Sequence, residues 1–270
     1  MIDFKEISTA TSLYNFHSHT QFCDGRATME EFVEAAVNAG MLHYGFTPHS
    51  PVPIDSPCNM SESSVREYFD EVNRLRSLYS GRISLYAGME IDYLGPDWGP
   101  SHSYFSTLPL DYRIGSIHFV ASDSGPIDID GRFPSFQKKM HQFFADDIEA
   151  VVRSFYQATS DMIDAGGFDI IGHFDKIGHN ASHFRPGIED EPWYRRLADD
   201  TVDHILDSRL IVEINTKALA DHKRFFPATR HWQRLLQAGT VLLVNSDTHY
   251  PHLVQAGRHE ALDLLKKLSL

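Results

Sequence analysis

Eight histidine and carboxylate side chains lie at the ends of short apolar segments that are spread along the whole chain. They are His17, His19, His49, Glu90, His118, His173, Asp247 and His249. Each apolar segment has the length and composition of a β-strand. In a barrel of parallel strands, the C-terminal ends of all strands open onto one face, where active sites collect. The pattern therefore predicts that folding gathers six imidazoles and two carboxylates into a single cup.

The rest of the chain alternates in the way that such a barrel requires. Apolar segments at 13–16, 44–47, 83–89, 113–117, 168–172, 210–212 and 240–246 predict strands, and segments with one apolar face at 28–40, 61–79, 146–165, 193–207 and the C-terminus predict helices. This alternation predicts a parallel sheet with helical crossovers. An open doubly wound sheet also fits, but it concentrates its site at one switch point. Site candidates after strands all along the chain favour a closed or nearly closed barrel, and 270 residues fit one such domain over residues 1–270.

Local signals refine this prediction. Thr28 followed by Glu31 three residues later predicts a capping box at the start of the first of these helices. Two connections, 92–111 and 121–146, are long and rich in Gly, Pro, Ser and aromatic residues. Long connections of this kind are often lids or specificity loops, and the alternative is a solvent-exposed insertion.

Composition limits the class of partner. Lys and Arg total 24 against 37 Asp and Glu, which gives a formal net charge of −13. This balance argues against nucleic acid as a partner, because phosphate-backbone binding normally requires a basic face. The two cysteines fit a reducing compartment, the first residues lack a signal core, and no apolar run is long enough to span a bilayer. We therefore expect a cytoplasmic protein with no membrane partner, and the sequence leaves its oligomeric state open.

The spacing of the histidines suits metal ions. In an extended segment, residues two apart point to the same side, so His17 and His19 can hold one ion together. Asp247 and His249 repeat this spacing, and a barrel places its last strand beside its first. Imidazoles with carboxylates suit zinc, manganese or iron better than calcium or magnesium. Asp24 precedes Gly25, so it is either part of an ordinary turn or a further oxygen ligand, and we favour the ligand.

Other residues carry no such pattern. We assign surface or structural roles to His43, His102, His141, His204, His231, His252 and His259. Cys23 lies near the predicted cup, where a small buried filler is the simplest role.

Six segments resemble the PHP (polymerase and histidinol phosphatase) family of phosphoesterases, and two of them look most like its monofunctional histidinol-phosphatase branch. The segments are 15–20 (NFHSHT), 46–51 (FTPHSP), 88–92 (GMEID), 115–119 (GSIHF), 171–175 (IGHFD) and 245–249 (NSDTH). The resemblance implies a distorted (β/α)7 TIM-like barrel with two or three divalent ions in a cup at the C-terminal ends of the strands. By residue, it implies a first ion on His17, His19, Glu90 and Asp247, a second on Glu90, His118 and His173, and a third on Asp24, His49 and His249. The chain departs from the family at 217–224, where relatives more often have a glycine-containing loop, and this bears on substrate selection.

The function implied is hydrolysis of a small phosphate monoester, L-histidinol phosphate, in histidine biosynthesis. A hydroxide that bridges two ions and is held by Glu90 would attack phosphorus, and the general acid is left open between a water and His249. Lys176, Arg185 and Lys217 follow strands on the same face and are candidates for the phosphate oxygens. Asp92, Asp123 and Asp128 are candidates for the substrate amino group.

Other functions remain as alternatives. A PHP-type phosphoesterase could act on a nucleotide or another small phosphate ester with the same metals. A metal-dependent amidohydrolase also places His-x-His after its first strand, although it usually adds a bridging lysine where this chain has Glu90. A non-catalytic metal-binding protein would bind ions without turnover.

Overall fold

The computed structural model describes residues 2–269, so Met1 and Leu270, the two ends of the predicted domain, lie outside the described residues. Seven parallel strands form one sheet in the order β1-β2-β3-β4-β7-β8-β9. They are β1 (Tyr14–Asn15), β2 (His43–Phe46), β3 (Ser84–Asp92), β4 (Tyr112–Ser116), β7 (Ile170–Ile171), β8 (Ile211–Asn215) and β9 (Leu242–Asn245). Each predicted strand segment coincides with one of these strands, because each is a short apolar run that is buried on both faces.

The first and last strands meet in a seam made largely by side chains. A main-chain bridge joins Ser18 to Thr248 in parallel. The amide N–H of Phe16 donates to Asn245 Oδ1 at 2.9 Å, and Asn15 Nδ2 donates to Ser246 Oγ at 2.9 Å. The sheet is therefore a nearly closed barrel, which confirms the predicted distorted (β/α)7 architecture.

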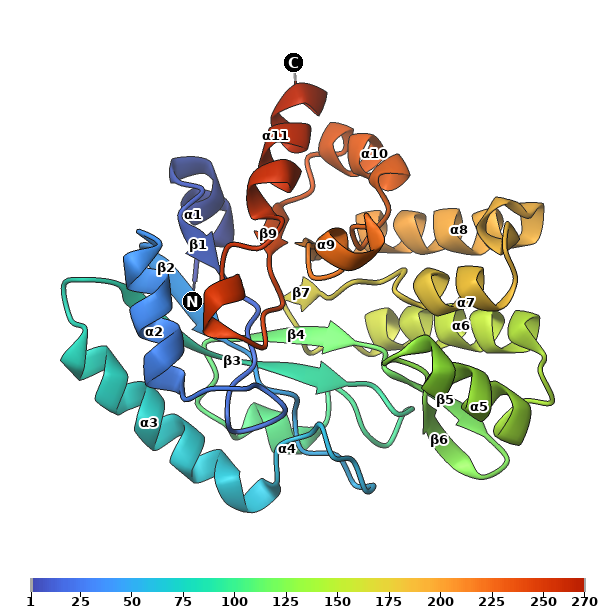
Figure 1. The fold of residues 1–270 in the computed structure, drawn as a ribbon, viewed down its shortest axis with the longest axis horizontal. Coiled ribbons are helices and arrows are strands. Elements are labelled where there is room, and N and C mark those ends of the chain that lie inside the picture. Colours follow the sequence, from blue (N-terminus) through green and yellow to red (C-terminus); the bar gives the residue numbers. More distant parts are fainter. Residues whose placement is uncertain (1, 270) are drawn as a thin grey trace.

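Helices surround the strands (Figure 1). The α-helices are α1 (Phe4–Ala10), α2 (Met29–Asn38), α3 (Val65–Leu78), α4 (Ser103–Ser106), α5 (Phe133–Phe143), α6 (Ile148–Ala165), α7 (Ile177–Phe184), α8 (Pro192–Ser208), α9 (Leu219–His222), α10 (Trp232–Gln237) and α11 (Arg258–Leu268). Short 3₁₀ turns are η1 (Glu62–Ser64), η2 (Ile188–Asp190), η3 (Thr229–His231) and η4 (Pro251–Leu253). Thr28 and Glu31 form the predicted capping box of α2. The helix predicted from residue 61 begins instead as the 3₁₀ turn η1, because Ser61 caps that turn.

The two long connections have different structures. The first, between β3 and β4, carries α4 and buries Phe105 completely, so it is part of the core rather than a lid. The second carries an antiparallel hairpin, β5 (Phe119–Ser122) with β6 (Gly125–Asp128), and then α5. Figure 1 shows this hairpin and α5 at one side of the molecule beside α7. Only the second connection is therefore placed to shape a site near the strand ends.

The interior below the strand ends is filled by aromatic and aliphatic side chains. One buried cluster contains Phe4, Tyr14, Phe16, Tyr112, Ile114, Ile170 and Leu243. The Tyr112 hydroxyl donates to the Phe16 carbonyl at 2.7 Å. A Cβ at Gly88 would lie 2.5 Å from the Tyr112 ring, so glycine is required there for the ring to cross the barrel. This packing supports the strand ends from below.

None of the helices in the described residues combines the length and the apolar character that a membrane span requires.

Candidate metal centre

All nine predicted site residues lie at the C-terminal ends of the barrel strands. They are His17, His19, Asp24, His49, Glu90, His118, His173, Asp247 and His249, and we call them the strand-end cup. Glu90 lies in β3, and the others lie on the segments that leave β1, β2, β4, β7 and β9. The parallel order of the strands gathers these residues from both halves of the chain, as the sequence pattern requires.

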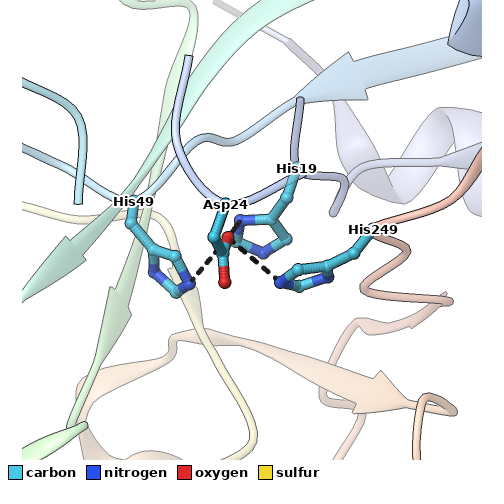
Figure 2. A group of neighbouring side chains, drawn as sticks. All are labelled: His19, Asp24, His49 and His249. Atoms are coloured by element: carbon cyan, nitrogen blue, oxygen red, sulfur yellow. Dashed lines mark ion pairs between the residues drawn. The ribbon is translucent and has the colours of Figure 1, made fainter. Parts of the chain in front are cut away.

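Asp24 faces three imidazoles. Its Oδ1 atom is 3.2 Å from His249 Nε2, 3.8 Å from His49 Nε2 and 3.9 Å from His19 Nδ1 (Figure 2). The loop that carries Asp24 turns back tightly on itself. A Cβ at Gly25 would lie only 2.3 Å from the Thr20 nitrogen, so this turn requires glycine. The Asp-Gly pair therefore makes a turn and also places the carboxylate in the cup, so the two alternatives for Asp24 are compatible.

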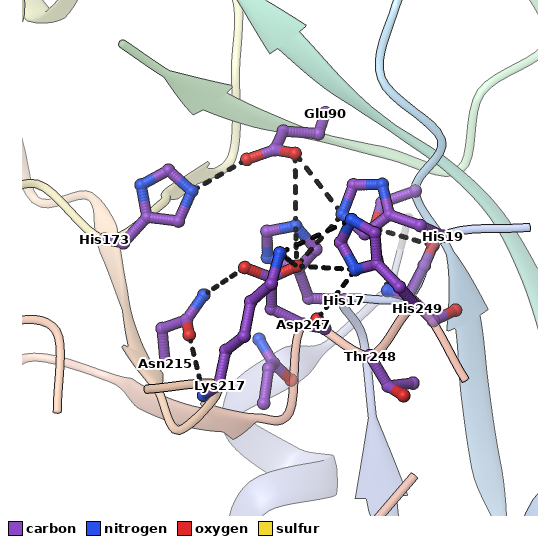
Figure 3. A network of polar contacts seen from close by, with 12 residues as sticks. His17, His19, Glu90, His173, Asn215, Lys217, Asp247, Thr248 and His249 are labelled. Carbon is purple, nitrogen blue, oxygen red and sulfur yellow. Dashed lines mark hydrogen bonds and ion pairs between the residues drawn. The ribbon is translucent and has the colours of Figure 1, made fainter. Parts of the chain in front are cut away.

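Glu90 occupies the centre of the cup. Its Oε1 atom lies 2.9 Å from His173 Nε2, and its Oε2 atom lies 3.3 Å from His17 Nε2 and 3.5 Å from His19 Nε2. Asp247 Oδ1 lies 3.1 Å from His19 Nε2 (Figure 3). The two oxygens of Glu90 thus face different imidazoles, which is the arrangement of a carboxylate that bridges two ions.

Several cup atoms are buried and have no hydrogen-bond partner among the described residues. They are His17 Nε2, His19 Nε2, Asp24 Oδ1, Glu90 Oε2 and His118 Nε2. Buried polar atoms in proteins are normally hydrogen-bonded, and each exception needs an explanation. These five atoms are all of the types that coordinate zinc, manganese or iron, so the donor set fits a group of divalent cations.

A second layer of carboxylates orients the imidazoles. His17 Nδ1 donates to Glu213 Oε1 at 2.6 Å, and His118 Nδ1 donates to Asp92 Oδ1 at 2.7 Å. Such bonds fix the tautomer that leaves Nε2 available as a metal ligand. Sequence reasoning gave Glu213 no role, although a glutamate inside a buried apolar strand was a signal. Asp92 was a candidate for the substrate amino group. It is buried, accepts hydrogen bonds from His118 and Asn59, and lies among the residues that line the cavity beside the cup.

Charges within the cup keep its carboxylates ionised. Burial alone would raise the pKa of Glu90, but the imidazoles of His17, His118 and His49 outweigh burial and hold it well below its usual range. Burial likewise opposes ionisation of Asp247, but the positive charges of Lys217 and His17 outweigh burial and hold its pKa well below the usual range. Both carboxylates are therefore ionised at neutral pH.

The imidazoles differ in their protonation. Burial lowers the pKa of His19 well below its usual value, and His249 and His49 lower it further, so His19 is neutral. Burial also lowers the pKa of His118, but Asp92 and Glu90 outweigh it and raise the value to about 9. A metal ion would have to displace a proton from His118, because only neutral imidazole coordinates.

Asp247 has an uncommon backbone conformation. Its φ angle is +47°, in the left-handed region. A non-glycine residue in this region costs of order 1 kcal/mol or more and is held there by its surroundings. The turn at the end of β9 directs the Asp247 carboxylate toward His17 and His19.

A cavity of about 970 Å³ opens beside the cup, and its lining includes Asp24, His49, His118 and Asp247. This volume is in the range of small-molecule sites. The second long connection contributes residues from Asp128 to Lys139 to its wall. That connection therefore lines the cavity beside the cup, and its role as a lid or specificity loop stays a prediction.

The three predicted cationic residues have different positions. Lys176 and Lys217 line the cavity. Lys176 Nζ lies 2.7 Å from Asp130 Oδ2, and Lys217 Nζ lies 3.3 Å from Asp247 Oδ1. Arg185 lies elsewhere, at the end of α7, where it pairs with Glu191 at 3.0 Å and stacks over Trp193.

Comparison with known proteins identifies the family to which this chain belongs. A PHP domain family model matches residues 15–217, about three quarters of the chain. Over 251 residues the chain is 27% identical to a probable histidinol-phosphatase of Deinococcus radiodurans, covering 89% of this chain and 88% of that protein.

Two solved structures share the fold. A Listeria monocytogenes protein, provisionally named histidinol phosphatase, matches with a TM-score of 0.82 at 18% identity and covers 92% of this chain and 99% of its own. The histidinol phosphate phosphatase of Lactococcus lactis, solved with zinc, L-histidinol and phosphate, matches with a TM-score of 0.74 at 20% identity and covers 96% of this chain and 94% of its own. Because the family model spans well over half of the sequence, the chain belongs to the PHP domain family.

Proposed function

We propose that this chain is a metal-dependent phosphomonoesterase that hydrolyses L-histidinol phosphate to L-histidinol and inorganic phosphate in histidine biosynthesis. One observation carries the proposal. Buried imidazole and carboxylate atoms converge at the edge of a ligand-sized cavity, and several of them have no hydrogen-bond partner among the described residues. The names of the Deinococcus and Lactococcus relatives support the choice of substrate.

The proposed metal ligands fall into three groups around Glu90. The first is His17, His19, Glu90 and Asp247; the second is Glu90, His118 and His173; and the third is Asp24, His49 and His249. Two or three zinc, manganese or iron ions fit these donors. When bound, such ions supply Lewis-acid charge and lower the pKa of coordinated water toward neutrality.

The residues of the chain provide binding and orientation. Lys176 and Lys217 are the proposed donors to the phosphate oxygens that face the cavity. Burial would lower the pKa of Lys176, but Asp130, Asp247 and Glu90 outweigh burial and raise it above its usual value, so this ammonium stays charged. Glu213 and Asp92 hold the rings of His17 and His118. With a net charge of −13, the chain is suited to a small ester rather than a nucleic acid.

The test is phosphate release by the metal-loaded protein from a panel of esters. The panel contains L-histidinol phosphate, a nucleoside monophosphate, a sugar phosphate and p-nitrophenyl phosphate. We expect the highest kcat/KM for L-histidinol phosphate and a loss of at least about a hundredfold in His17→Ala and Asp247→Ala. A higher kcat/KM for the nucleotide would assign another substrate, and wild-type rates in both variants would remove the cup from the reaction.

A further inference from the structure

A second group of histidines lies outside the strand-end cup. His179 and His183 stand one turn apart on α7, and His222 ends the short helix α9. The ring centroids of His179 and His183 are 4.6 Å apart, and those of His179 and His222 are 4.2 Å apart. One ligand nitrogen from each ring can be chosen so that all three lie within 4.8 Å of one another. Two histidines at i and i+4 on a helix face the same side, which is the spacing of a chelating pair.

The surroundings leave these nitrogens available. His183 Nδ1 donates to the His179 carbonyl at 2.8 Å, which fixes the tautomer and leaves Nε2 as the nitrogen with a free lone pair. No carboxylate within the described part of the chain forms an ion pair with any of the three rings. Burial lowers the pKa of His179 to about 4, with further contributions from His222, His183 and Arg224, so its ring is neutral at physiological pH. Neutral imidazole is the form that binds metals.

The rings need only a small movement to converge. Nitrogens that share a tetrahedral zinc ion at about 2.05 Å lie about 3.3 Å apart. His183 and His222 are exposed, so their side chains can rotate, while His179 is half-buried against Phe226. All three residues line the cavity that leads to the strand-end cup.

We propose that His179, His183 and His222 form a separate site for one divalent transition-metal ion, such as zinc, on the wall of this cavity. The ion would link α7 to α9, whose ligands His183 and His222 are 39 positions apart in the sequence. Three protein ligands leave one tetrahedral position for water. The site is independent of the proposed function, because none of its ligands belongs to the cup.

The test is a zinc titration that does not depend on activity. The protein is loaded with zinc, desalted to retain the tightly bound ions, and titrated again with ZnCl₂ by calorimetry. We expect one further equivalent in the wild type, and at least a tenfold weaker Kd for this equivalent in His183→Ala and His222→Ala. The exposed His252 lies outside the cluster, so His252→Ala should bind the further equivalent as the wild type does.

Cup variants separate the two sites. In His17→Ala we expect the protein to retain less zinc after desalting. The further equivalent that binds during the titration, which depends on His222, should remain. His222→Gln provides a second, polar replacement and should also weaken this equivalent. The proposal is overturned if the wild type takes up no further zinc. It is also overturned if the variants of His183 and His222 bind the further zinc with the same Kd as the wild type.

Discussion

The single residue Glu213 links four buried polar groups under the cup. Its carboxylate accepts from His17 Nδ1 at 2.6 Å, from Asn245 Nδ2 at 3.1 Å and from the His173 amide at 3.2 Å. It is completely buried. One carboxylate therefore holds groups from three strand ends, two of which, His17 and His173, are proposed metal ligands, although Glu213 is not itself in the proposed ligand set.

We expect Glu213→Gln to lower metal content and kcat/KM by about 10- to 100-fold, since loss of an orienting partner of a ligating histidine has this effect. An amide keeps the volume but cannot accept from His17, Asn245 and His173 in the same way. Elemental analysis and phosphate release measure the two effects. Glu260→Gln on the exposed side of α11 is the matched control, and equal metal content in both variants would contradict this role.

His231 provides a pH-dependent test away from the cup. Its side chain is 4% exposed, and burial together with Arg230 and Arg234 lowers its pKa to about 4. The unfolded chain, with a histidine pKa near 6.5, then takes up a proton that the folded chain refuses. The stability contributed by neutral His231 is therefore present at pH 7 and is lost as the pH falls from about 6.5 toward 4.

His231→Gln removes this titration. We expect the difference in unfolding free energy between wild type and variant to shrink by about 2 kcal/mol from pH 7 to pH 5. Denaturant unfolding at the two pH values measures it, with exposed His252→Gln as the control. A difference that stays constant between the two pH values would show that His231 is not held neutral by the fold.

At the element scale, the strands were predictable and several helices were not. Segments 83–89 and 240–246 contain continuous apolar runs at 85–89 and 241–244, so burial on both faces can be inferred from sequence alone. The hairpin of β5 and β6 and the helices α5, α7 and α9 were missed. The strands β5 and β6 and the helix α9 have only four residues each, too few to show a period. The apolar residues Phe133, Phe136 and Met140 of α5 do have helical spacing, so this helix had a signal in the sequence. Those elements form the cavity wall and hold His179, His183 and His222. The cup was thus predictable from strand ends, but the cavity and the second histidine group depend on tertiary contacts.

The fit of Tyr112 against β3 gives a stability test. Gly88→Ala places a methyl group 2.5 Å from the Tyr112 ring and 2.8 Å from Thr47 Cγ2. Overpacking in a well-filled core costs about 1–3 kcal/mol, so we expect a loss of this size in unfolding free energy. Exposed Ser84→Ala on the same strand should change it little. A Gly88→Ala protein as stable as the wild type would mean that Tyr112 can leave its place at no cost.

At the scale of the whole molecule, the proposed ions join the two ends of the barrel. His17 and His19 follow the first strand, and Asp247 and His249 follow the last, on either side of a seam with one main-chain bridge between Ser18 and Thr248. Ligands that cross this seam would add links that the hydrogen bonds do not supply. Metal binding and barrel closure are therefore expected to be coupled.

Chelation should lower the melting temperature. A ligand at a thousand times its Kd stabilises the folded state by about 4 kcal/mol, which corresponds to roughly 10 °C for a chain of this size. Differential scanning calorimetry with and without EDTA measures the shift. The double variant His17→Ala, Asp247→Ala should show a much smaller shift, and an equal melting temperature of the wild type in both conditions would exclude metal-linked closure.

The most direct test is phosphate release from L-histidinol phosphate as zinc or manganese is returned to chelated protein. We expect no release above background from the chelated protein, and recovery that saturates at two or three equivalents bound to the cup. Full activity in chelated protein that elemental analysis finds free of metal would contradict it.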